Sequence, residues 1–183
     1  MNVQTLVGYY DSNTFVVEYN GTVLIIDAGA PREAVLQAAA NKKPQAILLT
    51  HEHFDHTYHL DDYRKQFGCP VVSPANEDEI TVGKVKIKPM LCPGHSPASV
   101  VYLIGDCLFT GDVLFSDTIG RTDLTSGKIP AKATPEIRAK NEAQMQETLK
   151  RLLGVKFKTA YHGHHEPSTY EEQQKNIRRF VHT

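Results

Sequence analysis

The sequence contains no tryptophan, only three cysteines and no apolar run longer than a β-strand. Cys69, Cys92 and Cys107 are odd in number and widely spaced, which excludes a disulfide framework and a CxxC metal knuckle. We expect all three to be buried as small hydrophobic residues. The longest apolar stretches, 23–26 and 46–49, are far shorter than a spanning helix, so no membrane segment is expected.

Clustered positive charge is also missing. The chain has 20 Lys and Arg against 21 Asp and Glu, a formal net charge of −1, and no basic tract. Nucleic acids and anionic membranes bind clustered Lys and Arg, so neither is expected as a partner, and a small-molecule substrate is. The N-terminus shows neither a basic nor an apolar leader, which predicts a cytoplasmic protein. Composition leaves the oligomeric state open.

The length of 183 residues and the 40% apolar fraction predict one globular domain over residues 1–183. Apolar and β-branched runs predict strands at 3–7, 14–19, 22–27, 45–49, 70–73, 84–91, 99–104, 107–110 and 157–161. Asn20-Gly21 predicts a hairpin between the second and third of these strands. Helices are predicted at 31–40 with Pro31 in the first turn, after 56 to 67, at 134–153, and from 169 onward. In the last of them Thr169 and Glu172 have the pattern of a capping box, and Ile177, Phe180 and Val181 are expected to be buried. Residues 116–133 lack periodicity and predict a long functional loop. This order predicts an α+β fold with two sheets flanked by helices.

The most distinctive stretch is His-Glu-His-Phe-Asp-His at residues 51–56, directly after the apolar run 46–49. It places three imidazoles and a carboxylate within six residues at the expected end of a buried strand. Imidazole nitrogen and carboxylate oxygen are the ligands that Zn²⁺, Fe and Mn accept in proteins. This density of ligand types predicts a metal site.

Further ligand types lie at other predicted strand ends. His95 sits in the rigid turn Cys92-Pro93-Gly94-His95-Ser96-Pro97, and Asp112 follows the apolar run 107–109 through Thr110-Gly111. A third group holds His162, His164 and His165. Each of these alone is more often a solvated turn residue than a ligand. Their common place after strands favours a shared site.

Taken together, the motifs THEHFDH, PGHS at 93–96, FTGD at 109–112, GRTD at 120–123 and HGHHEPST at 162–169 resemble the metallo-β-lactamase fold superfamily. Within it the chain is most similar to glyoxalase II-like (hydroxyacylglutathione hydrolase-like) short single-domain hydrolases. The resemblance covers essentially the whole chain. It implies a four-layer αββα sandwich with a two-metal site at one open edge.

The resemblance also implies the role of each ligand. The first ion would be held by His51, His53 and His95, the second by Asp55, His56 and His164, with Asp112 bridging them. Two divalent ions are expected, zinc first, with iron or manganese also suited to this set. His162 and His165 compete with His164, which lies in the turn that matches the family. His59 is expected to be an exposed helix residue, with contact at the rim of the site as the alternative.

The implied activity is hydrolysis of a small thioester, S-lactoylglutathione or a related hydroxyacyl thioester, by a hydroxide shared between the two ions. The resemblance makes Asp55 the residue that orients this nucleophile and passes its proton onward. The sequence does not continue into the helical region that holds glutathione in glyoxalase II, so that domain is not expected. Arg121 and Asp123 are expected to form a structural ion pair, with a place at the rim of the site as the alternative.

Other activities remain open at this stage. A persulfide dioxygenase would use one iron held by His51, His95 and Asp112. Another ester or lactone hydrolase of the same fold is a further alternative. β-Lactam hydrolysis is weaker because Asp112 stands where the main zinc lactamases use cysteine, and because no secretion signal is visible. Nuclease branches need basic surface that this chain lacks, and a complete ligand set argues against a binding module with a vestigial site.

Overall fold

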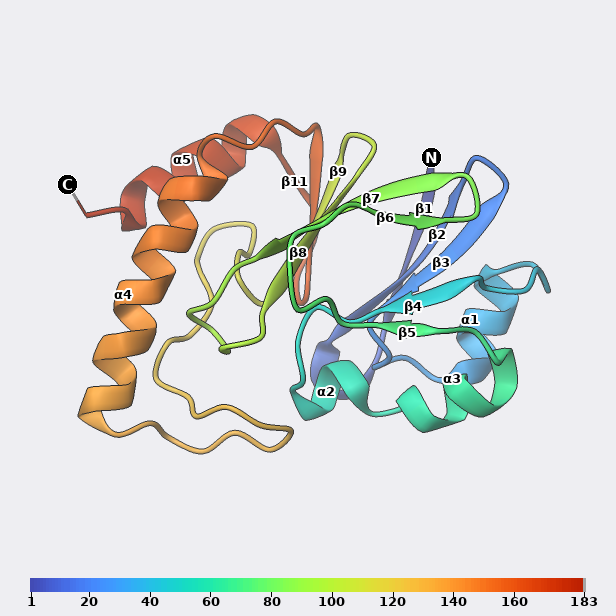
Figure 1. Cartoon of the computed structure of the whole chain (residues 1–183), viewed down its shortest axis with the longest axis horizontal. Helices are drawn as coiled ribbons and strands as arrows, with labels where there is room; N and C mark the ends of the chain where they lie inside the picture. Colours follow the sequence, from blue (N-terminus) through green and yellow to red (C-terminus); the bar gives the residue numbers. More distant parts are fainter. Residues whose placement is uncertain (183) are drawn as a thin grey trace.

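The computed structural model describes residues 1–182, so the last residue of the expected domain lies outside it. Within this range the chain forms two β-sheets that pack face to face between helices (Figure 1). The first sheet has the order β1-β2-β3-β4-β5, from Asn2–Val7, Asn13–Tyr19, Thr22–Ile26, Ala46–Leu48 and Val71–Val72. The second has the order β11-β10-β9-β8-β7-β6, from Ser168–Thr169, Thr159–His162, Cys107–Gly111, Val100–Ile104, Val85–Leu91 and Ile80–Val82.

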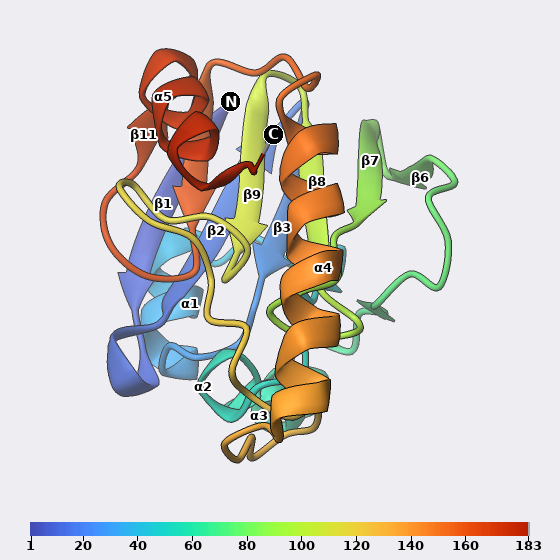
Figure 2. The ribbon, with the colours of Figure 1, turned by 90° about the vertical axis from the view of Figure 1, so that its left-hand side faces the viewer.

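Three apolar cores hold these layers together. Between the sheets, Phe15, Leu24 and Leu48 of the first meet Ile87, Tyr102 and Phe109 of the second. The outer face of the first sheet packs on α1 (Arg32–Ala38) and α3 (Leu60–Phe67). The outer face of the second is covered by α4 (Pro135–Leu152) and α5 (Tyr170–Phe180), which lie in front of it in Figure 2. The predicted α+β fold and αββα sandwich are confirmed.

Turn chemistry explains several of the boundaries. Asn20 and Gly21 both have positive φ, 49° and 76°, as a two-residue hairpin turn requires, and they join β2 to β3. The α5 helix begins with the predicted capping box between Thr169 and Glu172. The α4 helix begins with Thr134 accepting from Ile137 N. These local signals place the helices and hairpins where the sequence predicts them.

Some predicted elements differ from the structure. The helix expected after residue 56 is two helices, α2 (Phe54–Thr57) and α3, because the chain breaks at His59. Pro31 caps α1 and does not occupy its first turn. The short strands β6 and β11 were not predicted, since two or three residues carry too little pattern. Cys92 and Cys107 are buried as expected, but Cys69 is only half-buried because it lies just after α3, near the surface.

The C-terminal helix and the long loop complete the comparison. Ile177 of α5 is buried as predicted, whereas Phe180 and Val181 are half-buried at the helix end. Residues 116–133 contain no helix or extended strand, only isolated bridges from Leu114 to Ile119 and from Leu124 to Lys132. None of the helices in residues 1–182 combines the length and apolarity needed to span a bilayer.

The candidate site lies where both sheets end. The segment after β4 is joined to the second sheet by a hydrogen bond from Val100 N to Thr50 O, 2.7 Å. The turn after β10 is joined to the end of β9 by a hydrogen bond from Gly163 N to Gly111 O, 2.8 Å. Because β9 and β10 are parallel, their carboxyl ends meet at one edge of the sheet.

Candidate metal centre

The structure brings three histidines together on one side of the site. Ligand atoms of His51, His53 and His95 all lie within 4.8 Å of one another. His95 Nδ1 lies 3.0 Å from the carbonyl oxygen of Arg121, which fixes the proton on Nδ1. The Nε2 lone pair of His95 then faces His53 Nδ1 at 2.9 Å. Such converging imidazole nitrogens are suited to binding a cation between them.

A second group lies beside the first. Ligand atoms of Asp55, His56 and His164 also fall within 4.8 Å of one another. His164 Nδ1 donates to the carbonyl oxygen of Asp11 at 3.0 Å, so Nε2 is free to face Asp55 Oδ2, which lies 3.2 Å away. His56 Nε2 lies 3.5 Å from the same oxygen. The geometry is again that of ligands around a cation.

Asp112 lies between the two groups. Its Oδ1 is 3.2 Å from His56 Nε2, and its Oδ2 is 3.6 Å from both His95 Nε2 and His164 Nε2. The carboxylate therefore faces nitrogen atoms of each group. All seven residues predicted as ligands meet at this one site.

Buried atoms without partners test whether these residues fit a metal. Among the described residues, His51 Nε2, His53 Nε2, His56 Nε2 and Asp112 Oδ1 are fully buried and accept or donate no hydrogen bond. The short distance between His56 Nε2 and Asp112 Oδ1 lacks the alignment of a hydrogen bond. Leaving several polar atoms unpaired in one place is costly, and a bound cation would satisfy them. The donor set fits divalent metal ions.

The electrostatics of the first group keep its imidazoles neutral. Burial lowers the pKa of His51 well below its usual value, and nearby His56 adds to the effect. Burial, with His95 adjacent, lowers the pKa of His53 to about 4. Burial also lowers the pKa of His95. Neutral imidazoles retain the lone pairs that a metal needs.

The charged residues of the site respond to one another. Burial opposes protonation of His56, yet the carboxylates of Asp112 and Asp27 outweigh it and raise the pKa of His56 well above its usual value. Burial raises the pKa of Asp112, but His56 and its neighbours hold that pKa well below the usual range. The ionised form of Asp112 is thus stabilised by positive charge beside it. A metal ion would supply that charge in place of the proton.

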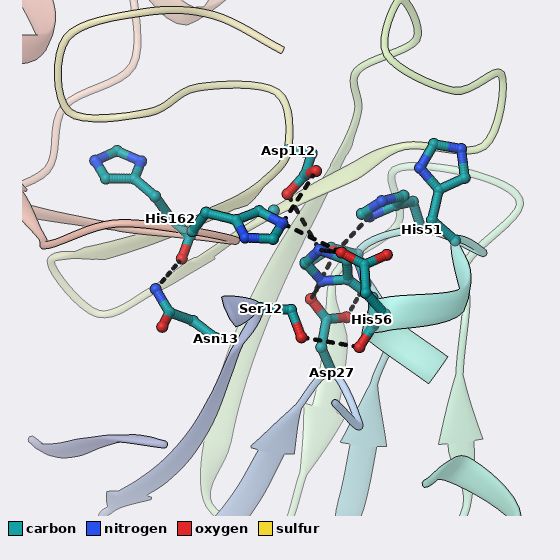
Figure 3. Close-up of polar contacts among 12 residues, drawn as sticks. Ser12, Asn13, Asp27, His51, His56, Asp112 and His162 are labelled. Carbon is teal, nitrogen blue, oxygen red and sulfur yellow. Dashed lines mark hydrogen bonds and ion pairs between the residues drawn. The ribbon is translucent and has the colours of Figure 1, made fainter. Parts of the chain in front are cut away.

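Asp27 supports the site from beneath and was not predicted. Its Oδ2 lies 2.8 Å from His56 Nδ1, and Thr50 donates to Oδ1 from N and to Oδ2 from Oγ1 at 2.8 and 2.7 Å. Figure 3 shows the His56 ring between the carboxylates of Asp27 and Asp112. Asp27 has φ 61°, a left-handed conformation that Asp tolerates better than most residues. The sequence feature that could have indicated a role for Asp27 in the site is its position directly after β3.

Gly163 makes room for this arrangement. A Cβ at residue 163 would overlap Asp112 Oδ1 and would come within 2.8 Å of His56 Cε1. The glycine is therefore needed for close approach of the backbone to the ligands. Sequence reasoning treated Gly163 only as part of a turn.

The remaining histidines have other environments. His162 is buried, with Nδ1 near Leu114 O at 2.7 Å and Nε2 near Ser168 Oγ at 2.9 Å, so its ring is held inside the fold. His165 lines a cavity beside the ligands. The expectation that His59 is exposed is wrong: it is half-buried because it lies at the start of α3, where its ring packs edge-on against Tyr58.

The GRTD motif contributes in two ways. Arg121 and Asp123 form the expected ion pair, with Nε–Oδ1 and Nη2–Oδ2 distances of 2.9 and 3.0 Å. Arg121 also lines the cavity, and its carbonyl oxygen orients His95. The two interpretations of this motif therefore both describe the structure.

A cavity of about 630 Å³ opens onto the ligands. His53, Asp55, His95, Asp112 and His164 form its polar end. Its size and its mixture of apolar walls with a few convergent polar groups are typical of small-molecule sites. The candidate ligands are thus accessible to a small molecule.

The comparison with known proteins decides the family. A family model described as the metallo-beta-lactamase superfamily matches residues 7–91 and 75–164. The chain belongs to the metallo-beta-lactamase superfamily. The motifs at 51–56, 93–96 and 109–112, from which this family was predicted, lie inside the matched residues.

Curated relatives within this superfamily include enzymes. The chain is 32% identical to a probable metallo-hydrolase, YqgX, of Bacillus subtilis, over 66% of this chain and 74% of that protein. It is 31% identical to the hydroxyacylglutathione hydrolase of Idiomarina loihiensis, over 66% of this chain and 54% of that enzyme. The chain therefore spans about half the length of this hydroxyacylglutathione hydrolase.

Solved structures share the fold. The BLEG-1 B3 metallo-beta-lactamase superposes with a TM-score of 0.82 at 24% identity, covering 99% of this chain and 100% of that one. ETHE1 from Myxococcus xanthus gives 0.78 at 23% identity, covering 99% and 85%. TTHA1623, solved in a di-iron-bound form, gives 0.77 at 25% identity, covering 96% and 98%. These likenesses confirm the αββα architecture.

Proposed function

We propose that the protein is a metal-dependent thioester hydrolase with two divalent ions, zinc before iron or manganese. Family membership and the His/Asp cluster support a metal-dependent hydrolase. In the proposal one ion is held by His51, His53 and His95, the other by Asp55, His56 and His164, with Asp112 between them. The substrate is a small molecule, and the protein acts in the cytoplasm.

The observation that carries the two-ion proposal is the position of Asp112. Its two oxygens face nitrogen atoms of both groups at 3.2 to 3.6 Å. If only one ion were bound, one of the two groups would stay empty. Its buried nitrogen and carboxylate atoms would then have no partner, which is unfavourable. A carboxylate shared by two ligand groups supports a binuclear site.

When bound, such a pair of ions supplies a Lewis acid and lowers the pKa of water at the site. The chain supplies the rest. Asp55 lines the cavity, and its carboxylate can accept a hydrogen bond from the attacking water, which orients the water toward the thioester carbonyl. Burial raises the pKa of Asp55, but its hydrogen bond with His164 outweighs this and keeps the pKa below the usual value. Asp55 is therefore ionised, and its carboxylate is able to accept this hydrogen bond.

The choice of a thioester comes from the relatives. A hydroxyacylglutathione hydrolase at 31% identity supports it, and the shared length of 54% of that enzyme makes the substrate a proposal. The competing prediction, one iron on His51, His95 and Asp112 in a persulfide dioxygenase, makes no use of Asp55 and His164. The relatives named as hydrolases, at 31% and 32% identity, favour hydrolysis.

The test combines metal analysis with two assays on the purified protein. We expect close to two divalent ions per chain and hydrolysis of S-lactoylglutathione or a simpler thioester. His164→Gln should lose one ion and most activity, whereas His182→Gln, a histidine of the exposed tail, should keep both. A single iron with oxygen uptake on adding glutathione persulfide would overturn the proposal.

A further inference from the structure

One wall of the cavity is built from large apolar side chains that lie outside the three cores of the fold. They are Tyr10, Phe54, Phe115, Leu124, Ile129 and Pro130, defined here as the apolar wall. None of them is fully buried, and none belongs to the three cores. Apolar side chains gathered around a cavity and left partly in water mark a surface for an apolar ligand.

Two members of the wall show this most strongly. Ile129 is 82% exposed and Tyr10 is 74% exposed, although both line the cavity. Ile129 lies in the long loop that is fastened to the ligand stretch by a hydrogen bond from Gly127 N to Glu52 Oε1, 3.2 Å. The loop thus holds Ile129 beside the cavity with most of its apolar surface in water, which is unfavourable. Contact with an apolar group would remove that surface from water.

Little in the cavity recognises a charged substituent. Among the described residues that line it, Arg121 is the one permanent cation. Its guanidinium is engaged twice by Asp123, so its charge is largely balanced. Lys128 lies outside the lining, with Nζ 5.7 Å from the centroid of the Phe54 ring. Lys128 therefore brings a positive charge beside Phe54, at the rim of the cavity lining.

Biological thiols that carry acyl groups are larger than short acyl chains and are charged. A charged carrier fits the rim near Lys128 better than a cavity whose walls are apolar. The acyl side then lies against the wall. Phe54 adjoins Asp55 in the chain and Phe115 follows Asp112 by three residues, so the wall begins directly beside the proposed ligands.

Resting on the proposed function, we infer that the substrate is a thioester with an apolar acyl group, aliphatic or aromatic, which binds the apolar wall. The hydroxyacyl group of S-lactoylglutathione is then a poorer match than an unsubstituted chain. Burying each further methylene against the wall should raise kcat/KM by about two- to fourfold until the chain fills the cavity.

The experiment measures kcat/KM of the metal-loaded protein for glutathione thioesters of acetate, propionate, butyrate and hexanoate, with S-lactoylglutathione alongside. We expect a steady rise with chain length and the propionyl ester to exceed the lactoyl ester, which differs by one hydroxyl. A second series keeps the acetyl group and lengthens an apolar thiol. A rise confined to the thiol series would overturn the assignment of the wall to the acyl side.

Variants tie the effect to the wall. Ile129→Ser should flatten the dependence on acyl chain length, and its exposed position leaves the fold intact. The matched control is Ile137→Ser, at a residue 40% exposed on α4 and away from the cavity, which should keep the wild-type dependence. An unchanged dependence in Ile129→Ser would overturn the inference.

The outcomes separate the inference from the proposed function. Hydrolysis of all thioesters with no rise, or with lactoyl preferred, overturns the apolar acyl group and leaves thioester hydrolysis standing. Hydrolysis of none of them overturns the proposed function itself.

Discussion

Replacing Asp27 by Asn tests the support beneath the second ligand group. Asp27 is fully buried, and its Oδ2 lies 2.8 Å from His56 Nδ1. This carboxylate fixes the proton of His56 on Nδ1 and leaves the Nε2 lone pair facing Asp112 at 3.2 Å. Asparagine keeps the size of the side chain while removing its charge and one acceptor.

The variant has no orientation that satisfies every neighbour. If the NH₂ group of the introduced asparagine faces His56, its N–H meets the N–H on His56 Nδ1, and the two donors repel. This favours the His56 tautomer that carries its proton on Nε2, which is the proposed metal-binding atom. With its NH₂ reversed, it meets the backbone N–H of Thr50, which donates to Oδ1 at 2.8 Å in the native protein. Loss of an outer partner of a ligating histidine costs about 10- to 100-fold in metal affinity, or about 1.4–2.7 kcal/mol.

The assay titrates metal-free protein with zinc in competition with a chromogenic chelator, which resolves two affinities. In Asp27→Asn we expect one affinity to weaken by about 10- to 100-fold. The other should change little, and it reports that the variant is folded. Asp106→Asn is the matched control because Asp106 pairs with Lys158 at the surface. Two unchanged affinities in Asp27→Asn would refute the role assigned to this carboxylate.

Three further variants test the rest of the site. Asp112→Ala should lose metal and activity together, since its carboxylate faces both groups, and full metal content by elemental analysis would contradict its bridging role. Gly163→Ala should weaken metal binding by about 10- to 100-fold by displacing that carboxylate. The control Gly154→Ala adds only an ordinary contact and should bind metal normally; equal affinities in the two variants would contradict the steric argument. Glu52→Ala removes both hydrogen bonds, from Gly127 N and from Ser96 Oγ, and should raise KM about fivefold by loosening the loop at Gly127; an unchanged steady-state KM would show that the loop does not depend on them.

The fold was predictable where the signal is local. The Asn20-Gly21 turn, the capping box at Thr169 and the apolar runs each act within a few residues, and the elements formed as predicted. Strands β6 and β11 could not be predicted, because they exist through their pairing with β7 and β10. The break at His59 also depends on a distant partner, since its backbone N–H donates to Ala28 O at 2.8 Å.

The clustering of the candidate ligands was predictable because each lies at the end of a strand and all these strands end at one edge. Asp27 was missed because its contact with His56 spans 29 residues and has no local pattern. His162 and His164 show that residue type alone does not reveal which histidine faces the site. Strand alternation and the bulge after Tyr161 turn His162 into the fold, while the Gly163 turn sends His164 toward Asp55. Two identical side chains two residues apart thus have different roles.

The two kinds of surface at the site come from different parts of the fold. The candidate ligands follow β4, β7, β9 and β10, whose ends are fixed by the packing of the two sheets. The exposed part of the apolar wall comes instead from connections between strands, with Tyr10 before β2 and Ile129 in the 116–133 loop, whereas Phe54 and Phe115 lie beside the candidate ligands. Connections tolerate sequence change that sheet ends do not, because few core contacts depend on them. Substitutions in the wall should therefore alter which substrate is used, and substitutions at the strand ends should alter whether metal is bound.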